Sequence, residues 1–284
     1  MASTFLSRRS TTSPALHFRE GPRNGPALLL LHGVARDASD WEGLLPTLKR
    51  DWQVIALDQR GHGRSEWAQG EYRVIDYARD AAAFIREHCA SPVTVLGHSL
   101  GAMVALWLAA ECDAQIARVV LEDPPFHTMG RRIVSTPYRH QFAAMRDLAC
   151  QRWEDLEALT EALSNVELPS VAGTVRLGDL RDRDSLRYSA ECLRRVDPDV
   201  FSPLVAGVWL DAFDHEALWA RVKCPVLLLQ GDPAMGGACS DADVALARER
   251  TGHCRHQRFD GVGHQIHGTR PQEVLAALKR FVRQ

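Results

Sequence analysis

The chain has 284 residues, of which 45% are hydrophobic and 25% are charged, and its formal net charge at pH 7 is -2. This composition is typical of a soluble globular protein, and the charge gives no general attraction to nucleic acid or to an anionic membrane. The seven cysteines are odd in number and form no Cys-x-x-Cys pair, which favours reduced thiols in a cytoplasm over a secreted disulfide framework.

Short apolar runs alternate with helical patterns in the first 125 residues and again near the C-terminus. The first twenty residues are expected to add one or two antiparallel edge strands. The apolar runs end at glycine or polar residues, as strands buried in a parallel sheet do; they lie at 27–31, 53–57, 93–96, 116–121 and 226–229, with a late strand around 253–256. Helices are predicted at 40–50, 74–88, 100–111, 240–250 and 271–282.

The alternation stops between about residues 127 and 215, where helical patterns predominate. They lie at 136–150, 153–164, 184–195 and 200–211, and residues 174–177 are interpreted as a loop. Trp209 and Phe213 are four residues apart and are expected to share a helix face. We therefore predict a core domain of residues 1–126 and 216–284, with a helical cap at 127–215 inserted between the sixth and seventh core strands.

The pentapeptide Gly97-His98-Ser99-Leu100-Gly101 contains a candidate nucleophile. It lies between the predicted strand at 93–96 and the predicted helix at 100–111, so Ser99 would occupy a tight, strained turn at a helix N-terminus. Side chains in place of the two glycines would clash with neighbouring elements, and the free N–H groups of the first helical turn favour a negatively charged oxygen. This context predicts that Ser99 is a catalytic nucleophile.

A serine hydroxyl is a poor nucleophile until a base accepts its proton. The best candidate for that base is His264, which follows the small residues Gly261-Val262-Gly263 between the last predicted strand and the last helix. His267 is the nearest competitor, but it lacks the small neighbours Gly261 and Gly263, which would let the loop reach the nucleophile.

Two backbone N–H groups are expected to form an oxyanion hole, which binds the negative oxygen of a reaction intermediate. One belongs to Leu100, directly after Ser99, and the other to Val34, in the loop after Leu31-His32-Gly33. Loss of one such donor typically lowers the rate by about 10²- to 10³-fold. The side chain of His32 is expected to brace this loop rather than to take part in the chemistry.

Four motifs in this order resemble those of α/β-hydrolase fold enzymes over nearly the whole chain outside the cap. They are Leu31-His32-Gly33, Asp58-Gln59-Arg60-Gly61-His62-Gly63-Arg64-Ser65, Gly97-His98-Ser99-Leu100-Gly101 and Gly263-His264. The resemblance implies an α/β fold with a mostly parallel, eight-stranded sheet, helices on both faces and a helical cap over the active site. It also implies that Ser99 is the nucleophile, His264 the base, and Val34 and Leu100 the oxyanion donors. The loop at 58–65 resembles a common turn of the family and is interpreted as structural.

The third catalytic residue departs from the usual pattern of the family. Most relatives place the acid after the seventh strand in a Gly-x-x-Asp frame, but here Gly231-Asp232-Pro233-Ala234 has alanine at that position. Some relatives, including certain lactonases and dehalogenases, use a carboxylate after the sixth strand, where Asp123 stands beside the strand of Ser99. We favour Asp123, which would hold the tautomer of His264 and stabilise its protonated ring. Asp232 is the alternative acid, and Glu122, expected on the other side of the strand, ranks third.

A serine at the nucleophile position argues against dehalogenase and epoxide-hydrolase chemistry, which in this family needs a carboxylate nucleophile. Ser99 with His264 implies acyl transfer to water through an acyl-enzyme. The main hypothesis is hydrolysis of a carboxylic ester or lactone of a small to medium, largely apolar substrate. The alternatives are a carbon–carbon bond hydrolase that acts on a vinylogous diketone, and a hydrolase-like receptor that binds a small molecule with little or no turnover.

No cofactor and no metal ion are expected, and the partner implied is a small-molecule substrate. The histidines and the cysteine at 253–256 alternate along a strand, so they are not expected to converge on one ion. Neither nucleic acid nor a membrane is an expected partner, and no apolar run approaches the roughly 20 residues needed to span a bilayer. The sequence leaves homo-oligomerisation open, and the expected location is the cytoplasm.

Overall fold

The structure, a computed structural model, describes residues 5–90, 92–170 and 173–283. Its main sheet has the strand order β1-β2-β4-β3-β5-β6-β9-β10. The pairs β1–β2 and β2–β4 are antiparallel, whereas the other neighbours are parallel, which confirms the mostly parallel eight-stranded sheet. The strands are β1 (Leu6–Arg9), β2 (His17–Glu20), β3 (Ala27–Leu31), β4 (Gln53–Leu57), β5 (Val93–His98), β6 (Ile116–Glu122), β9 (Val226–Gly231) and β10 (Cys254–Phe259).

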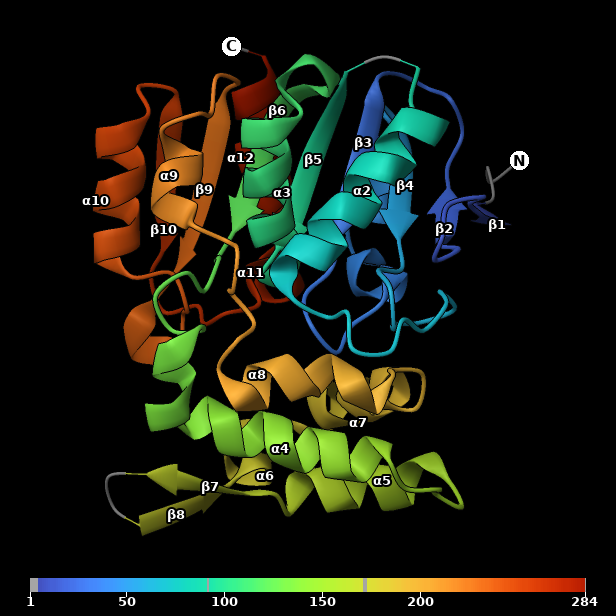
Figure 1. Cartoon of the computed structure of the whole chain (residues 1–284), viewed down its shortest axis with the longest axis vertical. Helices are drawn as coiled ribbons and strands as arrows, with labels where there is room; N and C mark the ends of the chain where they lie inside the picture. Colours follow the sequence, from blue (N-terminus) through green and yellow to red (C-terminus); the bar gives the residue numbers. More distant parts are fainter. Residues whose placement is uncertain (1–4, 91, 171–172, 284) are drawn as a thin grey trace.

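Helices cover both faces of the sheet because its central strands are apolar on both faces (Figure 1). In β3, Leu29 and Leu31 belong to one buried cluster and Leu28 and Leu30 to the other, as alternating side chains require. The first cluster includes residues of α2 (Val74–His88), α3 (Leu100–Glu111), α9 (His215–Trp219) and α10 (Asp241–Arg250). The second includes residues of α1 (Leu45–Leu48), α11 (Ile266–Thr269) and α12 (Pro271–Val282).

The predicted bounds of α2, α3 and α12 agree with the structure, but the single helix predicted at 40–50 is wrong. The chain there forms a 3-10 turn, η1 (Ala38–Trp41), and then the separate short helix α1. Pro46 lies in the first turn of α1. Because proline lacks an N–H and fits only the start of a helix, it separates the two elements.

The cap, residues 127–215, lies beyond the carboxyl ends of the parallel strands (Figure 1). Its helices α4, α5 and α7 correspond to predicted ones, and its division from the core as a domain of its own stays a prediction. The cap elements are η3 (Arg131–Ser135), α4 (Pro137–Ala149), α5 (Leu156–Ser164), β7 (Glu167–Ser170), β8 (Gly173–Arg176), α6 (Leu177–Leu180), α7 (Arg183–Leu193), η4 (Pro198–Phe201) and α8 (Ser202–Ala206).

Two predictions for the cap are wrong. Residues 174–177, interpreted as a loop, mostly form β8, which pairs antiparallel with β7. Among the described residues of this hairpin only Leu168 is buried, so the apolar alternation that indicates a strand is missing. The helix predicted at 200–211 ends early, because Gly207 takes a left-handed φ of 75°. Trp209 and Phe213 therefore share no helix face, although both are buried.

Polar contacts hold the second half of the cap against the core. Arg195 Nη2 lies 2.6 Å from Asp37 Oδ2. Arg36 Nη1 donates a hydrogen bond of 2.9 Å to Ser189 Oγ. Both contacts join α7 and the residues after it to the loop that follows β3, so the cap is fixed next to the loop that carries Val34.

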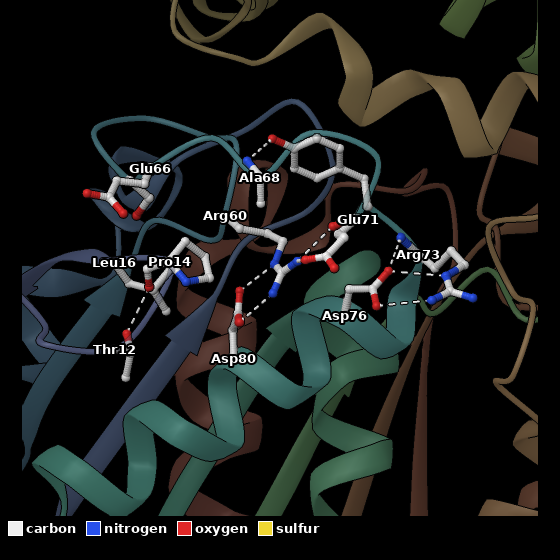
Figure 2. A network of polar contacts seen from close by, with 12 residues as sticks. Thr12, Pro14, Leu16, Arg60, Glu66, Ala68, Glu71, Arg73, Asp76 and Asp80 are labelled. Carbon is white, nitrogen blue, oxygen red and sulfur yellow. Dashed lines mark hydrogen bonds and ion pairs between the residues drawn. The ribbon is translucent and has the colours of Figure 1, made fainter.

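Polar side chains of the loop at 58–65 bind it to neighbouring segments. Arg60 donates from Nε and Nη2 to the two carboxylate oxygens of Asp80 in α2, at 2.5 and 2.6 Å, and from Nη1 to the carbonyl of Glu71 at 2.9 Å (Figure 2). Asp58 accepts hydrogen bonds from the backbone N–H groups of Ala38 and Arg64. These bonds tie the loop to α2 and to the segment after β3, which agrees with a structural role.

No helix in the described part of the chain is both long and apolar enough to cross a lipid bilayer. Within the same residue ranges, no three His, Cys, Asp or Glu side chains gather in a way that could hold a metal ion. The predicted late strand is present as β10 and carries Cys254 and His256.

Candidate active site

Ser99 occupies the turn between β5 and α3 in a backbone conformation that non-glycine residues rarely adopt. Its φ is 53° and its ψ is -111°, so the turn is strained in the way that functional sites often are. The N–H of Ser99 donates to the carbonyl of Glu122 at the end of β6, with an N···O distance of 2.9 Å. This bond ties the turn to the neighbouring strand, and the residue lines a cavity between the core and the cap.

Gly97 and Gly101 are required by close packing. A Cβ atom at Gly97 would lie 2.1 Å from the carbonyl oxygen of Gly101, and one at Gly101 would lie 2.0 Å from the carbonyl oxygen of Leu31. Relief of either clash would displace the backbone of α3 or β3. These distances agree with the prediction that side chains at the two glycine positions would clash with neighbouring elements.

We expect Gly101→Ala to lower the free energy of unfolding by about 3 kcal/mol or more, because the new methyl group must displace the central strand β3. Urea unfolding followed by circular dichroism measures this loss. Gly43→Ala is the matched control, since a Cβ at Gly43 would meet no atom within 4 Å, and its effect should stay below about 0.5 kcal/mol. Equal stability of the two variants would contradict the packing argument.

The N–H groups of Leu100 and Val34 have no hydrogen-bond partner among the described residues. Leu100 is the first residue of α3, so its N–H has no carbonyl partner within the helix. Val34 follows β3 and lines the same cavity as Ser99. Both N–H groups are therefore available to a bound oxyanion, and their catalytic role stays a prediction.

His32 orients the peptide group that carries the N–H of Val34. Its Nδ1 lies 2.7 Å from the carbonyl oxygen of Gly33, and its Nε2 accepts from the N–H of Gln59 at 3.0 Å. The carbonyl of Gly33 and the N–H of Val34 belong to one planar trans peptide, so they point in opposite directions. The bond to Gly33 thus fixes the direction of the Val34 N–H, and His32 braces the loop as expected.

Asp123, directly after β6, contacts His264. His264 Nδ1 lies 2.6 Å from Asp123 Oδ2. The same carboxylate accepts hydrogen bonds from the backbone N–H groups of Gly231, Ala238 and Cys239 at 2.9, 2.7 and 3.1 Å. Asp123 is fully buried and, like the residue at the nucleophile position, has a positive φ, here 47°. The three backbone N–H groups fix the orientation of the carboxylate, and the carboxylate in turn orients the ring of His264.

Burial raises the pKa of Asp123, but the hydrogen bond and charge interaction with His264, together with the backbone N–H groups, outweigh burial and hold that pKa below 3.8. The carboxylate is therefore ionised at neutral pH. A carboxylate bound to Nδ1 keeps a proton on that nitrogen and leaves Nε2 of His264 free to accept one.

Ser99 and His264 line the same cavity, which has a volume of about 640 Å³. Within the described chain no hydrogen bond joins their side chains; such contacts are often long in a free enzyme and tighten when substrate binds. His98 holds the histidine loop, because its Nε2 donates to the carbonyl of His264 at 3.0 Å. Burial and two neighbouring histidines lower the pKa of His98 well below 6.5, so its ring is neutral.

The two other candidate acids have different partners. Asp232 accepts hydrogen bonds from the N–H groups of Ala234 and Gly261, and Glu122 accepts from the N–H and Nδ1 of His267 at 2.8 and 2.9 Å. Neither is joined to His264 by any hydrogen bond of the described residues. The structure thus brings His264 together with Asp123 alone, and the catalytic roles of these residues stay predictions.

His267 is buried in a charged cluster that no sequence motif marks. Its ring lies 2.9 Å from Glu122, 3.4 Å from Asp40 Oδ2, and stacks on Trp41 with ring centroids 4.4 Å apart. Burial lowers the pKa of His267, but the two carboxylates outweigh burial and raise that pKa to about 10. His267, the other candidate for the base, is therefore a charged, buried residue whose ring contacts Glu122 and Asp40.

We expect His267→Gln to lower the free energy of unfolding by about 3–5 kcal/mol at pH 6.5, because it removes the cation that lies between the buried carboxylates of Glu122 and Asp40. The folded-state pKa lies above the ordinary 6.5, so the stabilisation by His267 is complete below pH 6.5 and is lost as pH rises towards 10. Urea unfolding of both proteins at pH 6.5 and pH 9 should therefore give a stability difference that shrinks at the higher pH. A difference that grows with pH would contradict the assignment.

Comparisons with known proteins bear on this geometry. Residues 26–161 match the family model described as the alpha/beta hydrolase fold. The crystal structure of E-2-(acetamidomethylene)succinate hydrolase superposes with a TM-score of 0.76 at 24% identity, over 99% of this chain and 100% of that one. The chain has the α/β-hydrolase fold. The enol-lactonase from Burkholderia xenovorans LB400 shares this fold, with a TM-score of 0.74 at 21% identity, over 98% of this chain and 100% of that one.

One curated relative matches this chain in sequence over nearly its full length. It is 2-(acetamidomethylene)succinate hydrolase from Mesorhizobium japonicum, with 26% identity over 290 residues. The alignment covers 98% of this chain and 95% of the relative. The match therefore includes the cap as well as the core.

The cavity that contains Ser99 is lined by both apolar and charged side chains. Apolar side chains from the cap form much of its wall, among them Phe142, Met145 and Leu177. Two arginines, Arg36 and Arg181, also line it. No sequence signal marks either arginine as part of a site, because single arginines in loops carry no motif and only the fold brings them to the cavity.

Proposed function

We propose that the protein is a serine hydrolase that acts through an acyl-enzyme on Ser99. The observation that carries this proposal is the 2.6 Å contact between Asp123 and Nδ1 of His264, in the wall of the cavity that Ser99 also lines. A serine at a helix N-terminus, a histidine oriented by a buried carboxylate, and two unpaired backbone N–H groups are the parts that acyl transfer to water requires.

The reaction then proceeds in two halves. Nε2 of His264 accepts the hydroxyl proton of Ser99 while Oγ attacks the substrate carbonyl carbon, and the N–H groups of Val34 and Leu100 bind the oxyanion. The protonated ring, stabilised by Asp123, gives this proton to the leaving group as its bond breaks, and the acyl group stays on the serine. A water molecule, deprotonated by the same ring, attacks the acyl-enzyme, releases the acid and restores the hydroxyl.

The substrate class is a finer part of the proposal, and it draws on the relatives. The full-length relative is named for 2-(acetamidomethylene)succinate, which is a conjugated carbonyl compound and not a simple ester. This supports the alternative hypothesis, a hydrolase of a vinylogous carbonyl substrate such as a carbon–carbon bond hydrolase, better than the ester or lactone hypothesis. The enol-lactonase supports the lactone hypothesis less strongly, because at 21% identity the likeness concerns the fold alone.

Two measurements test the proposal. A fluorophosphonate probe followed by peptide mass spectrometry should find one adduct, on Ser99. A panel of p-nitrophenyl esters, lactones, vinylogous diketones and N-acyl enamines should then rank the substrate classes by kcat/KM, with the conjugated compounds first. An unlabelled serine together with no turnover of any compound would contradict the proposal and favour the hydrolase-like receptor.

A further inference from the structure

Two arginines line the cavity that contains Ser99, and they differ in their partners. Arg36 Nε lies 3.9 Å from Asp40 Oδ1, and its guanidinium lies 5.1 Å from the ring centroid of Tyr188. Arg181, half-buried between α6 and α7, forms no ion pair and no side-chain hydrogen bond with any residue that the structure describes. A cation withdrawn from water without an anion is unfavourable, so the protein keeps Arg181 in the cavity at some loss of stability.

The neighbouring groups do not supply the missing negative charge. The carboxylate of Asp182, next in the chain, caps α7 by accepting hydrogen bonds from the N–H and the hydroxyl of Ser185, both at 2.8 Å. Burial and the charge of Arg36 lower the pKa of Arg181 to about 10, and the opposing effect of Tyr138 is smaller. The guanidinium is therefore still protonated at neutral pH, and no carboxylate among the described residues forms an ion pair with it.

Tyr138, a residue of α4, lines the same cavity as Arg181. Burial and the charge of Asp123 raise the pKa of Tyr138, whereas the charge of Arg181 lowers it. Ser99 and His264 line this cavity as well. An anion bound at Arg181 would therefore share the cavity with the carbonyl group that Ser99 attacks.

We propose that Arg181 binds a carboxylate of the substrate, so that the enzyme prefers substrates that carry a free carboxylate besides the reacting carbonyl group. This inference rests on the proposed function, since it names the substrate class of the same site. The planar fork of guanidinium N–H groups matches the two oxygens of a carboxylate, and the hydroxyl of Tyr138 offers a further donor. The apolar wall formed by Phe142 and Met145 suits the carbon skeleton that joins the two groups.

A kinetic test compares esters of equal carbon number that differ in charge. The p-nitrophenyl monoesters of succinate and glutarate carry a free carboxylate, and p-nitrophenyl butyrate and valerate are their neutral matches. The readout is the ratio of kcat/KM for the anionic ester to that for its neutral match, after subtraction of the spontaneous rate. We expect a ratio of about 10 or more in the wild type, and a ratio lower by about 10- to 100-fold in Arg181→Gln.

Two further variants complete the kinetic test. Arg181→Lys should keep part of the preference, because it retains the charge but not the fork of donors. Arg194→Gln is the matched control, since it removes an exposed arginine at the C-terminal end of α7, and it should leave the ratio unchanged. A purely structural role of Arg181 would lower kcat/KM for both esters together and leave their ratio intact, which would overturn the inference.

A binding measurement separates this inference from the proposed function. In Ser99→Ala protein, succinate and glutarate are titrated calorimetrically with and without the Arg181→Gln change. We expect the added change to weaken binding by about tenfold or more, and Arg194→Gln to have no effect. Equal affinities would overturn the carboxylate assignment even if Ser99 is the nucleophile. Undiminished turnover by Ser99→Ala would instead overturn the proposed function, and the titration would still decide the role of Arg181.

Discussion

Replacement of Ser99 by alanine is expected to lower kcat by about 10⁴- to 10⁶-fold on any substrate that the wild type cleaves. The reason is that the hydroxyl of Ser99 stands at the start of α3, where the N–H groups of Leu100 and Val34, unpaired among the described residues, can bind the oxyanion. Steady-state kinetics with the best substrate of the panel measures the loss, and a fluorophosphonate probe should no longer label the variant.

The control for this experiment is a serine outside the cavity. Ser202→Ala in α8 removes a hydroxyl whose hydrogen bond, 3.2 Å long, is made to Asp199, and it should keep activity within about twofold of the wild type. The thermal midpoint of Ser99→Ala should be equal to or above that of the wild type. Residual activity of Ser99→Ala above about one per cent would show that the reaction does not depend on an acyl-serine.

The second large effect is expected for Asp123→Asn, which should lower kcat by about 10⁴-fold. An amide in place of the carboxylate can donate to Nδ1 of His264, which would move the ring proton to Nε2 and remove the base. The amide NH₂ group would also face the backbone N–H of Gly231 or Ala238, which now donates a hydrogen bond to the carboxylate. Two donors would then face each other without an acceptor. A stability loss of about 1–3 kcal/mol should therefore accompany the loss of activity.

Asp232→Asn is the matched change in the loop after β9, where most relatives place the acid. Asp232 is bound to the N–H groups of Ala234 and Gly261 and to the guanidinium of Arg258, so its substitution should change kcat by less than about threefold. The two variants are compared in kcat, in thermal midpoint and in labelling by the fluorophosphonate probe. A severe loss in Asp232→Asn with near-normal Asp123→Asn would move the acid to the loop after β9.

The elements that could be predicted from the sequence are those whose signals are local. The helix at 74–88 has an amphipathic pattern, and the Ser99 turn follows from a five-residue motif between a buried strand and a helix. The preference for Asp123 over Asp232 depended on an unusual alanine at position 234, and the structure pairs Asp123 with His264. For the helix and the turn, neighbouring residues specify the local backbone, whereas the choice of Asp123 rested on the family resemblance and on its place beside the strand of Ser99.

The features without a local signal are those that the tertiary fold assembles. The cluster of Asp40, Glu122 and His267 joins η1, the end of β6 and the start of α11, which are distant in sequence. Arg181 is placed by the packing of the cap, and the β7–β8 hairpin has too few buried residues to display an alternating pattern. Single charged residues and exposed strands are decided by contacts that no short window of sequence contains.

The positive φ angles of Ser99 and Asp123 have a consequence for efforts to improve this protein. Each strained non-glycine residue typically costs about 1–3 kcal/mol of folding free energy, and the two sit at the ends of adjacent strands. Selection of variants for heat resistance alone would therefore reward changes that relax these two positions, and would erode the chemistry first. A directed-evolution campaign on this scaffold needs an activity screen in every round, with these two codons held fixed.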